Sequence, residues 1–242
     1  MPPVAGCHPE TDAVAEWTWL GRIPYRPALE LQEQIRNEIL AGRRRETLLL
    51  LEHPATITLG RHADPAHVLL PIPALRARGI DVCRTSRGGD VTFHGPGQLV
   101  GYPIFRLRRG VRAHMQAMAE SIVEWLAGLG LAAEWRDSAP GVWLGFDKIC
   151  AFGVHVRHRI ATHGFALNLA TELDGFSAII PCGLPSAGVT SLARQLGSAP
   201  PPEDVARSLI ALFEKNFGVQ LMEVRVPGCN WTAPLARIME AS

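Results

Sequence analysis

Cys182 is a candidate nucleophile because of the segment in which it stands. It lies in IIPCGLPSAGVTSL between Pro181 and Gly183, and the apolar run before it would present a thiol at the end of a strand or turn. An unperturbed thiol, with a pKa of about 8.5, is only about 3% thiolate at pH 7, so a reactive cysteine needs a neighbouring positive charge. A single cysteine is more often an inert small hydrophobic residue, and the segment alone leaves both interpretations open.

Lys148 is a second candidate, because lysine is rare in this chain. The chain has 24 basic residues, and only Lys148 and Lys215 are lysines. Lysine, unlike arginine, can release its proton near neutral pH in a suitable environment. Lys148 lies in the apolar segment GFDKICAFG. That segment fits either a lysine held in a pocket or one on an edge strand whose ammonium reaches the solvent.

A glycine-rich stretch, RGGDVTFHGPGQLVGYP at residues 87–103, indicates that main chain closely approaches another group. It lacks the GxxxxGK[ST] pattern of a P-loop, and GPGQLVG has one residue too many for a dinucleotide fingerprint, so phosphate binding is disfavoured. Its glycines could wrap an elongated apolar ligand, with Arg87 and His94 at one end. The alternative is two tight turns around a strand DVTFH, with His94 as a structural histidine.

The histidines and cysteines predict no metal site. His155, His158 and His163 have a spacing that is poor for one metal, and we expect them on a solvated strand face. The five cysteines are widely spaced and form no CxxC pair, so neither a zinc site nor a disulfide framework is indicated.

Periodicity predicts the elements that must position these residues. Helices are expected at residues 27–42, 113–128 and 203–217, the last closed by Gly218. Strands are expected in WTWLGRIPY, ETLLLLEHPATITLG and LVGYPIFRL, and the segments GVWLGFDKICAFGVHVRHR and THGFALNLA predict an antiparallel sheet. Helices and strands do not alternate strictly, so an α+β fold is favoured over a doubly wound one. We expect a flexible N-terminal tail at residues 1–16 and a single catalytic domain at residues 17–242.

The composition disfavours several classes of function. The net charge of +1 gives no global attraction to nucleic acid or to an anionic membrane. No apolar run reaches the roughly 18–20 residues that span a bilayer. The first fifteen residues lack the basic start and the apolar run of a signal peptide. We therefore expect a reduced, soluble, cytoplasmic protein with no nucleic-acid partner and no membrane association.

Five segments together resemble one family. RGGDVTFHGPGQLVGYP, LEHPATITLGR, GVWLGFDKICAFGVHV, THGFALNL and IIPCGL are similar to motifs of the lipoyl(octanoyl) transferases. These are the octanoyl-[acyl carrier protein]:protein N-octanoyltransferases of lipoic acid biosynthesis. The resemblance runs from about residue 17 to residue 217. It implies the α+β fold of the lipoate and biotin protein ligase superfamily, with a mixed or antiparallel sheet flanked by helices.

The resemblance also implies roles for particular residues. Cys182 matches the acyl-accepting nucleophile of the family, and Lys148 matches the lysine that lowers the pKa of the thiol and handles protons. No cofactor and no metal are implied. Asp90 stands at a position that we expect to vary, so it receives no individual role. Three segments match substrate-binding residues: Arg87, Gly88, Gly89, Asp90, Val91, Thr92, Phe93 and His94; Ala151, Phe152 and Gly153; and Gly164, Phe165 and Ala166.

These matches imply an acyltransferase of protein lipoylation. It would transfer an octanoyl or lipoyl group from acyl carrier protein to a lysine of lipoyl domains, through a thioester on Cys182. The implied acceptors are the lipoyl domains of 2-oxoacid dehydrogenase complexes and the glycine cleavage H protein, and a monomer would suffice. Three alternatives stay open: an ATP-dependent lipoate–protein ligase, which needs no nucleophilic cysteine, a non-catalytic fatty-acyl-binding protein, and a cysteine hydrolase that releases free octanoate.

Overall fold

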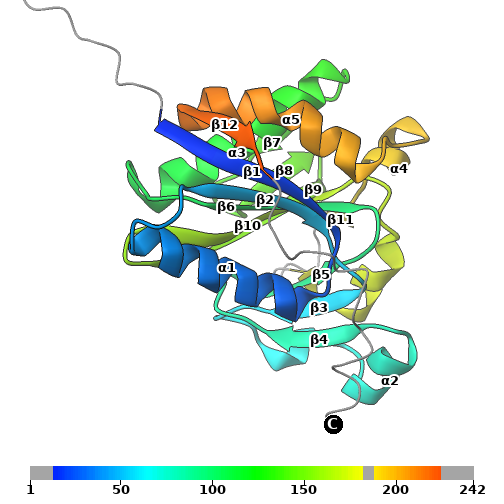
Figure 1. Ribbon diagram of the computed structural model, residues 1–242. Helices are drawn as coiled ribbons and strands as arrows, with labels where there is room; N and C mark the ends of the chain where they lie inside the picture. The colour runs from blue at the N-terminus through cyan, green and yellow to red at the C-terminus, as the bar shows by residue number, and fades with distance from the viewer. Residues whose placement is uncertain (1–12, 182–187, 225–242) are drawn as a thin grey trace, which may run out of the picture.

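The fold is built on a large mixed sheet with a small sheet beside it (Figure 1). The computed structural model describes residues 13–181 and 188–224. Within those residues, the large sheet consists, in spatial order, of β12 (Val219–Glu223), β1 (Ala13–Arg22), β2 (Thr47–Glu52), β6 (Gln98–Ile104), β10 (Ile160–Asn168), β9 (Asp147–Arg157), β8 (Gly141–Leu144) and β7 (Glu134–Trp135), with β11 (Gly188–Val189) paired to β9. The small sheet consists of β4 (Asp81–Arg84), β3 (Thr56–Leu59) and β5 (Val91–His94).

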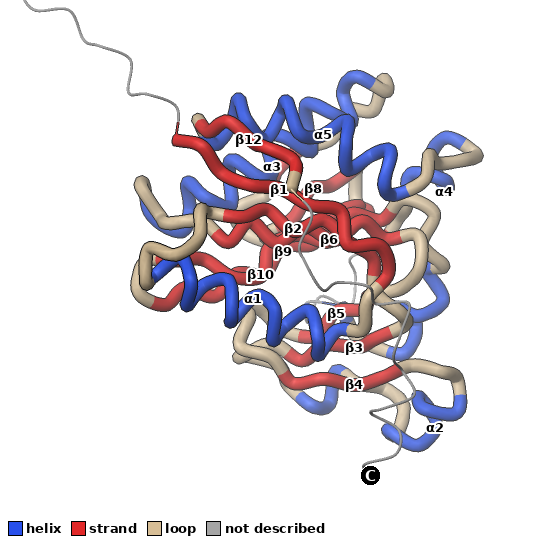
Figure 2. Tube along the Cα trace, viewed as in Figure 1, coloured by secondary structure: helices blue, strands red, loops and turns tan. Residues whose placement is uncertain are grey.

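Helices cover both faces of the large sheet (Figure 2). Helix α1 (Tyr25–Leu40) packs on one face, and α3 (Gly110–Gly128) and α5 (Pro202–Phe217) pack together on the other. The connections carry the short helices α2 (Ile72–Ala77) and α4 (Leu192–Leu196) and the 3-10 turns η1 (Pro65–His67) and η2 (Leu173–Ala178).

The continuous apolar run of β2 is explained by the helices that pack on both faces of the large sheet. Leu48 and Leu50 pack into the core cluster under α3 and α5, whereas Leu49 and Leu51 pack into the cluster under α1. All four side chains are fully buried. A strand that is covered on both faces has no solvent face, so its sequence does not alternate between apolar and polar residues.

The predicted fold class and the three long helices are confirmed, with shifted ends. Helix α1 begins at Tyr25, two residues before the predicted start at Pro27, because the first helical turn does not need the N–H that proline lacks. Gly42 follows the helix with a φ of +70°, a conformation that glycine adopts readily after a helix end. The predicted antiparallel sheet is confirmed by β8, β9 and β10.

The N-terminal boundary of the domain differs from the prediction. Residues 13–16, which we expected in a flexible tail, form the start of β1 and pair in parallel with β12. The partner strand comes from the other end of the domain, so the short segment AVAE carries no local signal of this pairing. The rest of the expected tail, residues 1–12, lies outside the described residues.

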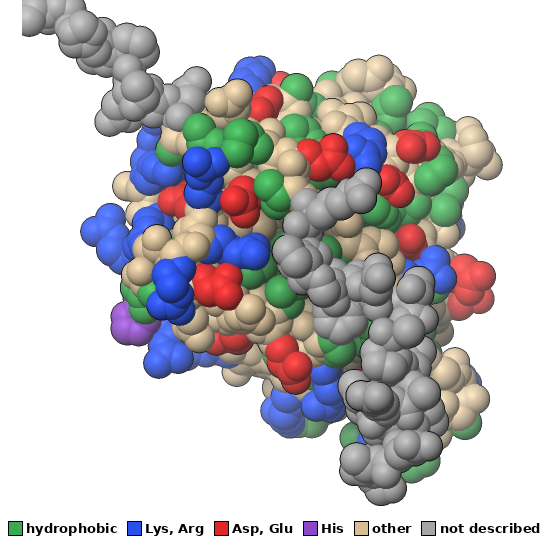
Figure 3. Space-filling model, in the orientation of Figure 1, with side chains coloured by type: hydrophobic (Ala, Val, Ile, Leu, Met, Phe, Trp, Pro, Cys, Tyr) green, Lys and Arg blue, Asp and Glu red, His purple; other side chains and the backbone are tan. Residues whose placement is uncertain are grey.

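Among the described residues, none of the helices has the length and apolar character needed to cross a membrane. Nowhere in residues 13–181 and 188–224 do three or more His, Cys, Asp or Glu side chains gather as metal ligands would. The face drawn in Figure 3 carries basic and acidic side chains side by side, as the net charge of +1 suggests.

Candidate active site

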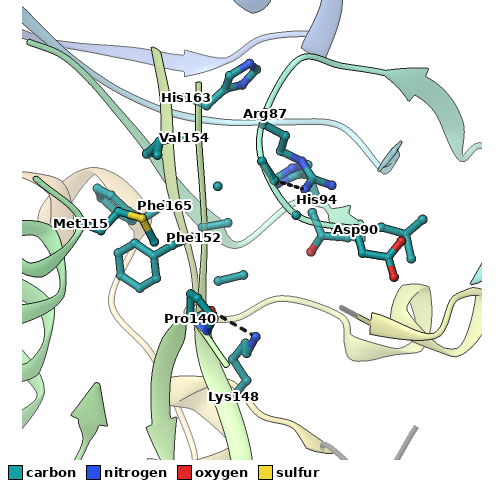
Figure 4. Close-up of a pocket in the computed structure, with 18 of the residues that line it drawn as sticks. Arg87, Asp90, His94, Met115, Pro140, Lys148, Phe152, Val154, His163 and Phe165 are labelled. Atoms are coloured by element: carbon teal, nitrogen blue, oxygen red, sulfur yellow. Dashed lines mark hydrogen bonds between the residues drawn. The ribbon is translucent and has the colours of Figure 1, made fainter. Parts of the chain in front are cut away.

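A cavity of about 470 Å³ brings together the segments singled out in the sequence (Figure 4). It is bordered by the glycine-rich stretch before β5 and by β9 and β10. The candidate nucleophile Cys182 lies outside the described residues. The sequence-predicted residues that line the cavity are Arg87, Gly88, Gly89, Asp90, Val91, Thr92, His94, Lys148, Ala151, Phe152, Gly153, Gly164, Phe165 and Ala166.

Phe93 is the predicted substrate-binding residue that does not line this cavity. Its ring packs in the core of the small sheet, edge-on to Phe176, with the ring centroids 5.4 Å apart. Its neighbours Thr92 and His94 do line the cavity. Successive side chains of a strand point to opposite faces, so a segment match over β5 includes a residue whose side chain belongs to the core.

Lys148 lies at one end of the cavity and is only 7% exposed. Its Nζ donates a hydrogen bond to the Pro140 carbonyl oxygen at 3.3 Å and stands 4.8 Å from the centroid of the Trp143 ring. Gly141 makes room for this side chain, because a Cβ there would lie 2.8 Å from Lys148 Cε. Of the two interpretations of Lys148 that the sequence allows, the pocket is therefore confirmed.

The cavity is elongated along β9. Figure 4 shows Lys148 at one end and His163 at the other. His163 pairs with Val154, six residues beyond Lys148 on β9. The walls between the two ends are largely apolar and are formed by Met115, Phe152, Val154 and Phe165.

Arg87 is a buried cation in the cavity wall, only 7% exposed. Its Nη2 donates to the Thr58 carbonyl oxygen at 2.7 Å and to Thr58 Oγ1 at 2.9 Å, and its Nε donates to the same hydroxyl at 3.1 Å. Its Nη1 donates to the carbonyl oxygen of Gly88 at 3.1 Å. These bonds tie the glycine-rich stretch to β3 and fix the guanidinium within the wall.

His94 lines the cavity as a neutral imidazole. It is 6% exposed, and its Nδ1 lies 2.8 Å from Gln98 Oε1. Burial, followed by the neighbouring His53 and Arg87, lowers the pKa of His94 well below its ordinary value. The ring stacks on Tyr25, with centroids 5.5 Å apart.

Two tyrosines and a histidine that the sequence did not single out lie next to His94. Tyr25 and Tyr102 line the cavity, and burial raises the pKa of both phenols. His53 Nδ1 lies 2.7 Å from the Ile23 carbonyl oxygen and must donate to it, which leaves Nε2 to accept from the Tyr102 hydroxyl at 2.8 Å. Burial lowers the pKa of His53 to about 4, in agreement with this neutral form.

The expectation of a solvated face is wrong for His163. The residue is 1% exposed and lines the far end of the cavity. Burial, and then the charge of Arg87, lowers the pKa of its imidazole to about 3. Its backbone φ of +60° is a left-handed conformation that is uncommon outside glycine, and the spacing of histidines in HVRHRIATH could not reveal it.

Solved structures of lipoate–protein ligases share this fold. A structure of lipoate-protein ligase A bound with ATP superposes with a TM-score of 0.71 over 93% of this chain and 94% of that chain, at 19% identity. The bipartite lipoate protein ligase of Thermoplasma acidophilum also gives a TM-score of 0.71, over 94% and 92% of the two chains, at 19% identity. At this identity the likeness shows the fold, which is that of the lipoate–protein ligase class.

Sequence comparison narrows the class to a family. The chain belongs to the lipoyl protein ligase A/B catalytic domain family, whose model matches residues 24–214. It is 46% identical to an octanoyltransferase of Chloroflexus aggregans over 79% of this chain and 90% of the relative. It is 44% identical to an octanoyltransferase of Rubrobacter xylanophilus over 82% of this chain and 91% of that protein.

Proposed function

We propose that this protein is an octanoyltransferase, which moves an octanoyl or lipoyl group from a thioester of acyl carrier protein to a lysine of a lipoyl domain. The observation that carries the proposal is the elongated apolar cavity ending at Lys148, in a member of this family. The strand from Lys148 to Val154 spans about 20 Å. The seven carbon–carbon bonds of an octanoyl chain, at about 1.5 Å each, reach at most about 11 Å. The chain therefore fits along the cavity with its carbonyl beside Lys148.

Cys182 is proposed as the residue that carries the acyl group. Among the described cysteines, Cys83 and Cys150 are buried, and burial raises the pKa of both thiols, which disfavours them as nucleophiles. Described residues before and after Cys182 in the sequence are hydrogen-bonded to the fold, and those after it pair with the strand of Lys148. The Ile180 N–H donates to the His67 carbonyl oxygen at 2.9 Å, and Gly188 and Val189 in β11 pair with Asp147 and Lys148 in β9.

In the first step of this mechanism, the Cys182 thiolate attacks the carbonyl carbon of the carrier thioester. The carbon–sulfur bond to the carrier breaks, and an octanoyl thioester forms on Cys182. The Lys148 ammonium stabilises the attacking thiolate and then gives a proton to the departing carrier thiolate, which leaves as a thiol. Lys148 becomes a neutral amine in an environment already shielded from water.

In the second step, the acceptor lysine attacks the thioester on Cys182. With a pKa of about 10.4 this lysine is mostly protonated at pH 7, which disfavours the reactive amine by roughly 4.6 kcal/mol. The neutral Lys148 amine takes that proton. The acceptor nitrogen then forms an amide with the octanoyl carbonyl, Cys182 leaves as a thiolate, and the second proton of the reacting amine passes to solvent. An arginine at position 148 could not take part in this exchange.

We further propose that the enzyme acts in the cytoplasm as a monomer, without a cofactor, on the lipoyl domains of 2-oxoacid dehydrogenase complexes and the glycine cleavage H protein. An ATP-dependent ligase is the nearest alternative, because the solved relatives with this fold include a lipoate-protein ligase A bound with ATP. The cysteine in IIPCGL and the identity to octanoyltransferases favour transfer over ligation.

One assay separates these functions. The protein is mixed with octanoyl acyl carrier protein and a lipoyl domain in the absence of ATP. The masses of the lipoyl domain and of the enzyme are then measured by mass spectrometry. Octanoyl transfer to the acceptor lysine, with a single octanoyl adduct on the enzyme when the acceptor is omitted, supports the proposal. Cys182→Ser should abolish the adduct, and Cys7→Ser is the matched control. Transfer that requires ATP, or transfer at full rate by Cys182→Ser, contradicts it.

A further inference from the structure

Two buried amides join the wall of the cavity to the strand that carries Lys148. Gln98 and Asn168 are directly paired residues of β6 and β10, and they are 1% and 4% exposed. Gln98 Nε2 donates to the Phe93 carbonyl oxygen at 3.1 Å and to Asn168 Oδ1 at 2.9 Å. Asn168 Nδ2 donates to the Thr190 carbonyl oxygen at 3.0 Å. Neither side chain lines the cavity, so the acyl-binding role of the neighbouring residues does not explain them.

The orientation of both amides is fixed by their partners. The carbonyl oxygens of Phe93 and Thr190 only accept hydrogen bonds, so each must face an amide nitrogen. Rotating the Asn168 amide by half a turn would place oxygen against the Thr190 oxygen and nitrogen against Gln98 Nε2. Gln98 therefore presents Oε1 to His94, and His94 Nδ1 must carry a proton and donate to it at 2.8 Å.

The hydrogen bonds then run in one direction through the site. Arg87 donates two bonds to Thr58 Oγ1, which leaves the Thr58 hydroxyl proton facing His94 Nε2 at 3.5 Å. His94 donates to Gln98, Gln98 donates to Asn168, and Asn168 donates to the Thr190 carbonyl. Hydrogen bonds aligned in this way polarise one another, and losing one buried member leaves its neighbours unsatisfied.

Thr190 connects this chain of bonds to Lys148. It is fully buried and directly follows β11, and its N–H donates to the Lys148 carbonyl oxygen at 3.0 Å. Strand β11 has only two residues, so its own pairing with β9 gives little independent stability. The Asn168 bond to the Thr190 carbonyl is a buried side-chain contact that holds this end of β11 against β9.

We propose that Gln98 and Asn168 are positioning residues of the acyl-transfer site: they fix His94 as the Nδ1–H tautomer, and they hold Thr190 and β11 beside Lys148. The expected effect on rate rests on the proposed function. In that function Cys182 is the nucleophile, and it lies six positions before Gly188 of β11 in the sequence.

The first test uses the wild-type chain and needs no activity. Nitrogen-15 NMR of the imidazole, assigned with His94→Gln, should show the proton of His94 on Nδ1. Hydrogen exchange should show a protected Thr190 amide. A proton on Nε2, or an unprotected Thr190 amide, overturns the proposal even if every variant at position 168 fails to fold.

The second test uses Asn168→Leu, which keeps the approximate volume and removes both hydrogen bonds. We expect the rate of octanoyl adduct formation to fall about tenfold or more, while the KM for the carrier stays within about twofold. A tenfold fall corresponds to about 1.4 kcal/mol, which is the order of the cost of one unsatisfied buried hydrogen-bonding group. The fraction of His94 in the Nδ1–H tautomer should fall, because only the Phe93 carbonyl oxygen then orients the Gln98 amide. Thr190→Val is the matched control: it removes the bond from Gln195 Nε2 to Thr190 Oγ1 and leaves the backbone bonds in place.

The outcomes separate this proposal from the proposed function. A wild-type rate in Asn168→Leu, or an equal loss in Thr190→Val, refutes the positioning role. If the wild type forms no octanoyl adduct at all, the proposed function fails, and the His94 tautomer and the Thr190 amide still decide the structural part.

Discussion

Gly101→Ala should narrow the acyl cavity by pushing the Phe165 ring into it. Gly101 in β6 is paired with Phe165 in β10, and a Cβ on Gly101 would lie 2.0 Å from Phe165 Cε1 and 2.3 Å from Cζ. Both are side-chain atoms, so the ring can move while the backbone pairing stays. On another side the ring is stacked on Phe213, with centroids 5.6 Å apart. The open space next to Phe165 is the cavity that it lines.

The size of the effect follows from the contact distance. Ordinary contact begins at 3.4 Å, so the ring must retreat by about 1.4 Å, roughly one carbon–carbon bond. We expect the free energy of unfolding to fall by about 1–3 kcal/mol, the usual cost of overpacking a core. Displacing one CH₂ group of the ligand from an apolar site costs about 0.8 kcal/mol, which is about a fourfold loss in kcat/KM for an octanoyl donor.

The assay compares octanoyl and hexanoyl carrier protein as donors, with urea denaturation to report stability. Gly101→Ala should shift the preference toward the hexanoyl donor, and adding Phe165→Leu should restore both stability and octanoyl transfer. Gly128→Ala is the control, because nothing lies within 4 Å of a Cβ at that position. Unchanged stability together with an unchanged octanoyl-to-hexanoyl ratio would show that Phe165 does not yield toward the cavity.

Two further predictions concern Lys148 and His114. Lys148→Arg keeps a positive charge, but a guanidinium does not release its proton near neutral pH, so octanoyl adduct formation should fall at least about a hundredfold. Lys215→Arg, on an exposed lysine paired with Glu124, should leave it unchanged. Burial lowers the pKa of His114 to about 4 in the folded state, whereas its pKa in the unfolded state is about 6.5. Between these pH values the unfolded state binds a proton that the folded state does not. Stability should therefore be full above pH 6.5 and fall as the pH drops from 6.5 toward 4, with His114 contributing about 2 kcal/mol of the loss at pH 5. His114→Leu should reduce the difference in unfolding free energy between pH 7.5 and pH 5 by that amount, and an unchanged difference in urea denaturation would contradict the assignment.

Elements with a strong local pattern could be predicted from the sequence, and elements that depend on distant partners could not. Helices α3 and α5 show apolar spacing over four or more turns, and their predicted ranges agree closely with the structure. The start of β1 depends on β12, about two hundred residues later in the chain, so it could not be recognised locally.

The same distinction applies to the candidate site. The segment matches located Lys148 and the glycine-rich stretch, because those residues stand within continuous motifs. Tyr25, Tyr102 and His163 come from three separate elements, and only the packing of α1, β6 and β10 brings them to one cavity. Phe93 shows a second limit of motif matching. It lies within a continuous motif, but its side chain faces away from the cavity into the core of the small sheet.

The role of the glycine-rich stretch is also changed by the structure. Its glycines were expected to make room for a ligand. The contacts show that they also allow the backbone of the stretch to pack directly against the backbone of neighbouring strands. Gly88 N–H donates to the Val154 carbonyl oxygen at 2.9 Å, and a Cβ on Gly153 would stand 3.1 Å from the Gly88 oxygen. On the other side, a Cβ on Gly60 would lie 2.3 Å from the Gly89 oxygen. The stretch therefore joins the small and large sheets through backbone contacts. The cavity lies beside this junction and is lined by Arg87 and His94 on one side and by Lys148 of β9 on the other.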